Sequence, residues 1–263
     1  MFRILTYNVH YCRGTDGRVS PTRIAEVIAS CRPDIVALQE LDVGRARSGR
    51  IDQAREIARE LGMHMLFHPS IEVMEERYGN AILSVRPAKL VKAGGLPSRP
   101  RAEPRGALWA TVQLGGANLQ VVTTHLGLRR PERLLQVETL LGPEWLGHPA
   151  CREPFMLLGD FNAVPRSRAY RSLAMRLDDA SAAVTGRGRI ATFPSWLPVA
   201  RLDHVFACGI EVSRVETLRG RLARVASDHL PLLVEFQVAA AHERPARSGA
   251  VLERAGGGSG RAT

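Results

Sequence analysis

The chain has 263 residues, of which 45% are hydrophobic, and it carries a formal net charge of +10. This length and apolar content predict a globular protein with a sizeable core, in one large domain or two small ones. No run of about 18 apolar residues occurs, which argues against a membrane-spanning helix. The only lysines are Lys89 and Lys92, so nearly all the positive charge comes from arginines spread along the chain. A nucleic-acid-binding surface would be clustered, so the spread favours a compositional bias, with an acidic or phosphorylated substrate as the alternative.

The cysteines and the first residues indicate the compartment. No C-x-x-C pair and no histidine at zinc-finger spacing accompanies the four isolated cysteines, Cys12, Cys31, Cys151 and Cys208. This pattern predicts a reduced intracellular protein. The opening residues, MFRILTYNVH, are too few and too polar for the apolar core of a signal peptide. We therefore expect a cytoplasmic protein without a transmembrane segment, and peripheral membrane binding stays open.

The first part of the chain alternates short apolar runs with amphipathic stretches. We predict strands over residues 2–9, 35–40 and 64–68, and helices over residues 20–31 and 51–62. Ser20 would cap the first helix, with Pro21 in its first turn, and Gly62 would end the second. This order of elements is typical of an α/β protein.

From residue 79 the chain changes to β runs that follow one another without helices between them. We predict strands over residues 80–85, 107–114 and 119–126, and this section should be antiparallel. The further predicted elements are a helix over 131–141, a strand over 155–161, a helix over 167–175, and strands over 201–207, 210–218 and 231–236. Two β-rich halves, each with helices, favour two sheets packed face to face with helices outside.

The end of the chain differs in composition from the rest. After Val238 it consists mainly of small residues, arginines and glycines. Such a stretch has too little apolar bulk to offset the entropy lost on ordering. We therefore predict one domain over residues 1–240 and a disordered tail over residues 241–263.

Polar side chains gather where the predicted strands begin or end. These residues are Asn8, Glu40, His125, Asp160, Asn162, Asp203, Asp228 and His229. Each could be explained alone by a turn or a surface ion pair, but together they point to one rim of the fold. Carboxylate and asparagine oxygens suit Mg²⁺, Mn²⁺ or Ca²⁺, whereas zinc would need more histidine or cysteine. The remaining residues can supply the base, the acid and the phosphate contact that hydrolysis of a phosphate ester requires.

Seven short motifs carry a resemblance to a known family. YNVH, LQE, YGNAILS, TTHLG, GDFN, RLDHVF and SDHLP, in this order within residues 2–237, resemble the endonuclease/exonuclease/phosphatase superfamily of metal-dependent phosphoesterases. The resemblance implies a four-layer α/β/β/α sandwich of two mixed sheets with outer helices, and a site at one edge of the paired sheets. It also implies hydrolysis of phosphate esters with Mg²⁺ or Mn²⁺ as the cofactor.

The resemblance further implies how the metal and the attacking water are held. Glu40 would be the principal metal ligand, aided by Asn8 and Asp228. Asp160 would orient or deprotonate the attacking water, and Asn162 would hold that water or the phosphate.

Other positions would contact the phosphate. His229 would touch the scissile phosphate, and Asp203 would hydrogen-bond the other nitrogen of its ring. His125 matches the phosphate-contacting histidine of deoxyribonucleases and sphingomyelinases, which argues against abasic-site repair. Asn80 would support the His125 ring and Arg105 would contact the phosphate; the alternatives are a turn former and a surface charge.

The loops give the only indication of the substrate. They are short, with no basic insertion to follow a duplex and no aromatic series to stack bases. Residues 192–204, TFPSWLPVARLDH, place apolar groups beside Asp203, either as a hydrophobic lip or as loop packing. We expect a phosphodiester substrate, a lipid headgroup or small diester ahead of DNA or RNA, and an anionic lipid surface or nucleic acid as the partner. A nuclease and a catalytically silent binding module are the alternatives, and no feature indicates an oligomeric state.

Overall fold

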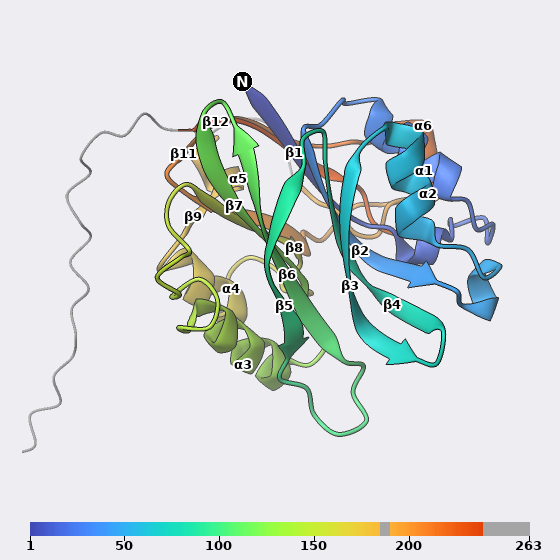
Figure 1. Cartoon of the computed structure of the whole chain (residues 1–263), viewed down its shortest axis with the longest axis horizontal. Coiled ribbons are helices and arrows are strands. Elements are labelled where there is room, and N and C mark those ends of the chain that lie inside the picture. Colours follow the sequence, from blue (N-terminus) through green and yellow to red (C-terminus); the bar gives the residue numbers. More distant parts are fainter. Residues whose placement is uncertain (185–189, 239–263) are drawn as a thin grey trace, which may run out of the picture.

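Two six-stranded sheets form the centre of the molecule, and helices cover the outer side of each (Figure 1). The computed structural model describes residues 1–184 and 190–238. The predicted fold class, an α/β protein with a four-layer α/β/β/α sandwich, is confirmed. The predicted tail over residues 241–263 lies outside the described residues. None of the described helices has both the length and the apolar character needed to cross a membrane.

The first sheet joins the two ends of the domain. In spatial order its strands are β11 (Ile210–Thr217), β12 (Leu232–Val238), β1 (Phe2–Asn8), β2 (Ile35–Val43), β4 (Glu76–Ser84) and β3 (His64–Val73). β1 and β2 are parallel, and the other neighbours are antiparallel. The register pairs Phe2 with Phe236, so the first and last strands lie side by side.

The second sheet is also mixed. In spatial order its strands are β5 (Ala88–Leu96), β6 (Arg105–Leu114), β7 (Ala117–His125), β8 (Phe155–Asp160), β10 (Asp203–Cys208) and β9 (Asp178–Asp179). β7 and β8 are parallel, while the other pairs are antiparallel. The parallel pair brings the carboxyl ends of β7 and β8 to the same edge.

Helices complete the outer layers. The first sheet is covered by α1 (Pro21–Ala29), α2 (Gln53–Leu61) and α6 (Arg221–Ala226), and the second by α3 (Arg130–Leu141) and α4 (Arg168–Ala174) (Figure 1). The short elements are η1 (His10–Cys12), η2 (Ala46–Ser48) and α5 (Ala180–Ala183). As predicted, the Ser20 side chain caps α1 by accepting a hydrogen bond from the Arg23 amide, and Gly62 ends α2 with a φ of 64°.

Strand alternation divides the core into layers. On β1, Leu5 and Tyr7 pack with the helices of the first sheet, while Ile4 packs between the sheets. Met156 and Leu158 of β8 meet Ile4 in the same central layer. Because both faces of these strands are buried, their sequences are nearly continuous apolar runs. The apolar packing fixes the two sheets face to face and thereby aligns their edges.

Three expectations about the strands need correction. The β run after residue 79 does not form one antiparallel unit, because β4 pairs with β2 and β3 whereas β6 and β7 pair in the other sheet. β5 was not expected, and its sequence holds Lys89 and Lys92 because much of this edge strand is exposed. Asp228 and His229 do not begin the last strand; they lie in a bend before Leu232, where β12 starts.

Candidate active site

Three neighbouring strands of the second sheet place a row of ionisable side chains at one edge. Asp160 ends β8, pairs in register with His125 at the end of β7, and pairs with Asp203 at the start of β10. The three residues therefore lie beside one another because of strand register alone. Asn8, at the end of β1, faces this row from the first sheet and donates a hydrogen bond to Asp160 Oδ2 (3.0 Å).

The amide of Asn8 bridges two carboxylates. Its Nδ2 atom lies 2.8 Å from Glu40 Oε1 as well as 3.0 Å from Asp160 Oδ2. Its Oδ1 atom accepts a hydrogen bond from the His10 amide (3.0 Å), which fixes the orientation of the side chain. Asn8 therefore presents its donor, and not its carbonyl oxygen, to the carboxylates. In this arrangement it holds Glu40 and Asp160 together, and its predicted role as a ligand stays a prediction.

Glu40 reaches the rim through a bulge in the middle of a strand. β2 continues to Val43, so the expectation that the strand ends at Glu40 is wrong. The pairing of β2 with β4 shifts between Leu38 and Leu41, and Glu40 has a φ of 64°. A bulge of this kind redirects one side chain, and a left-handed backbone at a non-glycine residue is a strained conformation that often marks a functional site.

The imidazole of His125 is buried and held on both sides. Arg105 Nη1 lies 3.0 Å from its Nδ1 atom, and Asn162 Nδ2 lies 3.0 Å from its Nε2 atom. Because a guanidinium can only donate, Nδ1 is the acceptor and the ring proton is on Nε2, 3.4 Å from Asp160 Oδ2. The Asn162 amide nitrogen donates to the Leu126 carbonyl, and its approach to Nε2 is then a contact between two donors and not a hydrogen bond. Burial and the positive charge of Arg105 hold the pKa of His125 well below its usual value. His125 is thus a neutral group that can donate a hydrogen bond.

The two secondary positions behave differently from each other. Arg105 is buried and also pairs with Glu103 at 2.5 Å, so the alternative of a surface charge is wrong. Asn80 is buried too, but its Nδ2 atom donates to the Gly106 carbonyl (3.1 Å) and not to the His125 ring. Asn80 therefore ties β4 to β6 beside Arg105, and any support that it gives to His125 passes through that neighbour.

His229 is an imidazole between two carboxylates. Its Nδ1 atom lies 2.8 Å from Asp203 Oδ2, and its Nε2 atom lies 3.7 Å from Asp160 Oδ2. Burial lowers the pKa of His229, but the charges of Asp203 and Asp160 outweigh it and raise that pKa to about 10. Burial raises the pKa of Asp160 to about 7, and the charge of His229 opposes this rise. Protonated His229 is therefore the favoured state at neutral pH.

Backbone hydrogen bonds hold the turn that carries His229. Ser227 Oγ donates to the Asn8 carbonyl (2.8 Å), which joins this turn to β1. From the other side, the Ser195 amide donates to the Asp228 carbonyl and the Leu230 amide donates to the Thr192 carbonyl, both at 2.7 Å. The loop around residues 192–195 and the end of β1 therefore fix the position of the turn.

Asp228 lies at the edge of the cluster. Its carboxylate is 3.8 Å from His10 Nδ1, and 38% of its side chain is exposed. It belongs to neither of the two groups of described side chains that could surround one ion, which are Glu40, His125 and Asp160, and Asp160, Asp203 and His229. Its predicted role as a metal ligand with Glu40 therefore stays a prediction.

The chemistry of the donors separates these two groups. Asp203 and His229 already form a charged pair, so the second group is best described as a held imidazolium. In the first group His125 carries its proton on Nε2, which leaves Glu40 and Asp160 as the available ligands. Two carboxylates brought together by the Asn8 amide suit a hard divalent cation such as Mg²⁺ or Mn²⁺.

Comparison with known proteins agrees with this geometry. Residues 5–229 match the model of the Endonuclease/Exonuclease/phosphatase family. The chain belongs to this family. The members of the family are hydrolases that act on phosphate esters.

Individual relatives share the fold over nearly the whole chain. The Escherichia coli (strain K12) protein YbhP is 27% identical over 248 residues, which are 90% of this chain and 96% of YbhP. The endonuclease/exonuclease/phosphatase from Beutenbergia cavernae DSM 12333 has a TM-score of 0.74 and 24% identity, and the match covers 91% of this chain and 72% of that one. The Bacteroides thetaiotaomicron VPI-5482 mannosyl-6-phosphatase Bt3783 has a TM-score of 0.73 and 21% identity, with 90% and 100% covered. At these identities the two solved structures show the shared fold.

Some residues near this family site were not singled out from the sequence. Phe193 packs against His229, with ring centroids 4.9 Å apart. Gln39, beside Glu40, donates to Thr123 Oγ1 (3.1 Å) and so links the two sheets below the site. Several arginines also line a pocket next to Asn162, and the sequence PRSRAYR directly after GDFNAV was the available signal for three of them.

Proposed function

We propose that this protein is a divalent-metal-dependent phosphodiesterase that hydrolyses a lipid headgroup or another small phosphodiester. The observation that carries the proposal is the position of Asp160. It lies between the Glu40 carboxylate, to which Asn8 joins it, and the His229 imidazole, which Asp203 holds. One buried carboxylate thus connects a cation site with a positively charged imidazole.

Glu40 and Asp160 are the residues that would hold Mg²⁺ or Mn²⁺. When bound, the ion supplies positive charge opposite the phosphoryl oxygens. The His229 imidazolium and an ion held by these two carboxylates would both supply positive charge to a bound phosphate. In this proposal Asn8 positions both carboxylates through its two hydrogen bonds.

The chain's own residues perform the proton transfers in this proposal. Asp160 lies beside both the cation site and the His229 ring, where a carboxylate can take a proton from the attacking water. His229 is protonated and contacts a phosphoryl oxygen, and Asp203 keeps its ring in place. His125, with its proton on Nε2, would donate to the same phosphate, and Asn162 lies beside that nitrogen.

An exposed apolar surface beside the imidazole supports an amphipathic substrate. Trp196, Leu197 and Val199 have 65%, 55% and 52% of their surface exposed, so they do not pack the interior of their loop. Phe193 begins this surface and touches the His229 ring. We refer to these four residues as the apolar lip. Through Phe193 the lip reaches the phosphate-contacting group, which favours a substrate that has an apolar part near its phosphodiester, such as a lipid at an anionic membrane surface.

The compartment is part of the same proposal. The four cysteines form no disulfide, which accords with a reducing compartment such as the cytoplasm. A lipid substrate would then be met at the inner side of a membrane, to which the protein binds from solution.

The test is to assay the purified protein on three substrates, with Mg²⁺ or Mn²⁺ and with EDTA. We expect metal-dependent hydrolysis of bis-para-nitrophenyl phosphate and of sphingomyelin in vesicles, and slower cleavage of plasmid DNA. Faster cleavage of DNA than of both diesters would replace the proposal with a nuclease. Failure to hydrolyse any of the three, by a folded protein that binds Mn²⁺, would indicate a binding module.

A further inference from the structure

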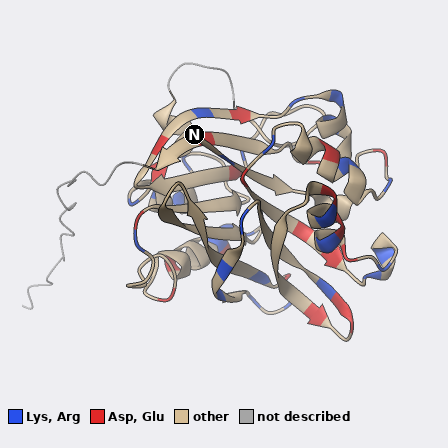
Figure 2. Ribbon diagram, turned by 45° about the horizontal axis from the view of Figure 1, so that its top comes forward, with Lys and Arg blue, Asp and Glu red and all other residues tan. Residues whose placement is uncertain are grey.

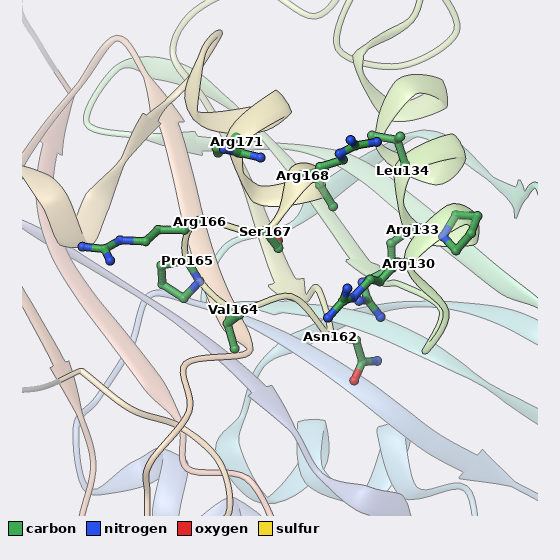
Figure 3. Close-up of a pocket in the computed structure, with 12 residues that line it drawn as sticks. Arg130, Arg133, Leu134, Asn162, Val164, Pro165, Arg166, Ser167, Arg168 and Arg171 are labelled. Atoms are coloured by element: carbon green, nitrogen blue, oxygen red, sulfur yellow. The ribbon is translucent and has the colours of Figure 1, made fainter.

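A large pocket adjoins the active site on the side of the second sheet. It has a volume of about 860 Å³ and lies between α3, α4 and the chain segment that follows Asn162 (Figure 3). This volume is within the usual range of pockets that bind small molecules. Asn162 lines the pocket and also contacts His125 Nε2 (3.0 Å). Asn162 therefore links the pocket to the group expected to contact the scissile phosphate.

The polar lining of the pocket is strongly cationic. Five arginines contribute to it: Arg130, Arg133, Arg166, Arg168 and Arg171. They come from two segments that are separate in sequence, residues 130–133 and 166–171, so the even distribution of arginine along the chain conceals a local cluster. Figure 2 shows basic residues scattered over many other elements, whereas Figure 3 shows Arg130, Arg133, Arg168 and Arg171 near one another, with the Arg166 side chain extending away from the other four. No carboxylate is among the described residues that line the pocket.

Most of these charges form no ion pair within the part of the chain that the structure describes. Within residues 1–184 and 190–238, the structure contains no ion pair for Arg130, Arg166, Arg168 or Arg171. Arg133 is buried, and its Nη1 atom is fixed by the carbonyl oxygens of Gly127 (3.2 Å) and Leu128 (2.5 Å). Burial and the nearby charge of Arg130 lower the pKa of Arg133. A group of like charges repel one another, and a bound anion would relieve that repulsion.

The pocket also contains apolar surface. Leu134, Val164 and Pro165 lie among the arginines. A ligand that matches both parts of this lining has a carbon framework, which contacts the apolar residues, as well as a negative charge, which contacts the arginines. Guanidinium groups are well suited to phosphate because they can donate two parallel hydrogen bonds to it.

We propose that this pocket binds a second phosphate group of the substrate, carried on the same small framework as the scissile phosphodiester. The inference rests on the proposed function, because it assigns the scissile phosphate to the adjoining site. It names the substrate class as a small phosphodiester with an additional phosphomonoester. The second phosphate selects the substrate and positions it, and takes no part in bond cleavage. Such a group occurs both in soluble phosphorylated polyols and in phosphorylated lipid headgroups.

The first test measures competition by ligands that differ only in the second phosphate. Inositol 1,4-bisphosphate and inositol 1-phosphate are used as inhibitors of the hydrolysis of bis-para-nitrophenyl phosphate. We expect the bisphosphate to bind at least about tenfold more tightly, since charge-assisted contacts to phosphate are strong. Arg130→Gln with Arg168→Gln should remove most of this difference. Arg176→Gln, an exposed arginine just beyond α4 that does not line the pocket, is the matched control and should preserve it.

Equal inhibition by both inositol phosphates, in wild type and variants alike, would overturn the proposal for the pocket. If the protein still hydrolyses the diester in that experiment, the proposed function is unaffected. If the protein hydrolyses no diester, the proposed function fails, and calorimetric titration with the two inositol phosphates still tests the pocket. Two further substrates distinguish the source of the phosphate: soluble glycerophosphoinositol 4-phosphate and vesicles that contain phosphatidylinositol 4-phosphate. Faster hydrolysis of the soluble substrate would identify a soluble phosphorylated polyol as the source of the second phosphate, and faster hydrolysis in vesicles would identify a lipid headgroup. Either result supports the proposal. A loss of single-stranded DNA cleavage in the double variant, with no effect on the inositol phosphates, would instead assign the pocket to nucleic acid and overturn it.

Discussion

The Nδ1 atom of His229 lies 2.8 Å from Oδ2 of Asp203, and both side chains are buried. The other carboxylate oxygen of Asp203 is buried without a hydrogen-bond partner among the described residues. The negative charge of Asp203 is therefore directed at a single ring nitrogen. This geometry makes Asp203 a positioning residue whose effect passes through His229.

The pair leads to the first prediction, which concerns non-additivity. His229→Ala should lower kcat by about 10²- to 10⁴-fold, as expected for loss of a group that transfers or stabilises a proton. Asp203→Asn should lower kcat less and leave KM nearly unchanged. In the double variant, loss of Asp203 should add little to the loss of His229, because residues that act as a unit are not additive. If the two losses multiply in steady-state assays, Asp203 has a separate task.

The second prediction concerns the metal. Glu40→Gln removes one of the two carboxylates that Asn8 holds together, so Mn²⁺ should bind more weakly in calorimetric titrations and activity should need more metal. Wild-type activity should vanish in EDTA and return with Mg²⁺ or Mn²⁺. Glu138→Gln, at an exposed position on α3, is the control and should bind Mn²⁺ as wild type does. Full activity in EDTA would contradict the assignment.

The third prediction concerns stability and pH. The Nε2 atom of His204 donates to the Ala163 carbonyl at 2.7 Å, while its buried Nδ1 atom has no partner among the described residues. Burial and the charge of Arg201 lower the pKa of His204 to about 4. Between that value and the ordinary pKa of about 6.5, the unfolded chain binds the extra proton, so stability falls as the pH falls. The full loss at His204 is about 3 kcal/mol.

Urea denaturation between pH 4.5 and 7.5 measures this effect. His204→Gln should flatten the dependence of unfolding free energy on pH, although the variant is less stable at pH 7. His64→Gln, at an exposed position, should keep the wild-type slope. An unchanged slope in His204→Gln would show that other groups, such as buried His125, carry the dependence.

The fourth prediction concerns the apolar lip. Trp196→Ser with Leu197→Ser should lower hydrolysis of sphingomyelin in vesicles by about tenfold or more, since each buried apolar side chain contributes roughly 1.5–3 kcal/mol. The rate on soluble bis-para-nitrophenyl phosphate should change far less. Met74→Ser, which is 92% exposed at the turn between β3 and β4, is the control and should affect neither rate. Equal losses on both substrates would show that the lip shapes the site itself.

Local sequence signals predicted most of the fold. Ser20, Pro21 and Gly62 mark helix ends through local capping, and the apolar runs of β1, β2, β8 and β12 are buried on both faces. β5 escaped prediction because Lys89, Lys92, Gly94 and Gly95 give it the composition of a loop. What stabilises it is pairing with β6, which is a tertiary contact that no local pattern contains.

In the site, too, local sequence motifs predicted individual residues, whereas features that depend on tertiary contacts were missed. The motifs identified Asp160, Asp203 and His229. Strand register brings Asp160 and Asp203 together, and the bend before β12 brings His229 to them. The bulge at Glu40 was not foreseen, because an irregularity in pairing depends on the partner strand β4. The arginine pocket was missed for a related reason: Arg130 and Arg168 are distant in sequence and meet only because α3 packs beside α4.

The hydrogen bond from Ser227 to the Asn8 carbonyl joins residues 219 positions apart. During synthesis, a growing chain that has emerged as far as Asp160 already contains Glu40 and the carboxylate that would take the proton from water. It lacks His229 and β12, the strand that places the turn against β1. A chain that ends between these points therefore lacks both the imidazole and the strand that positions it, so the two ends of the sequence must meet before this edge of the fold is complete.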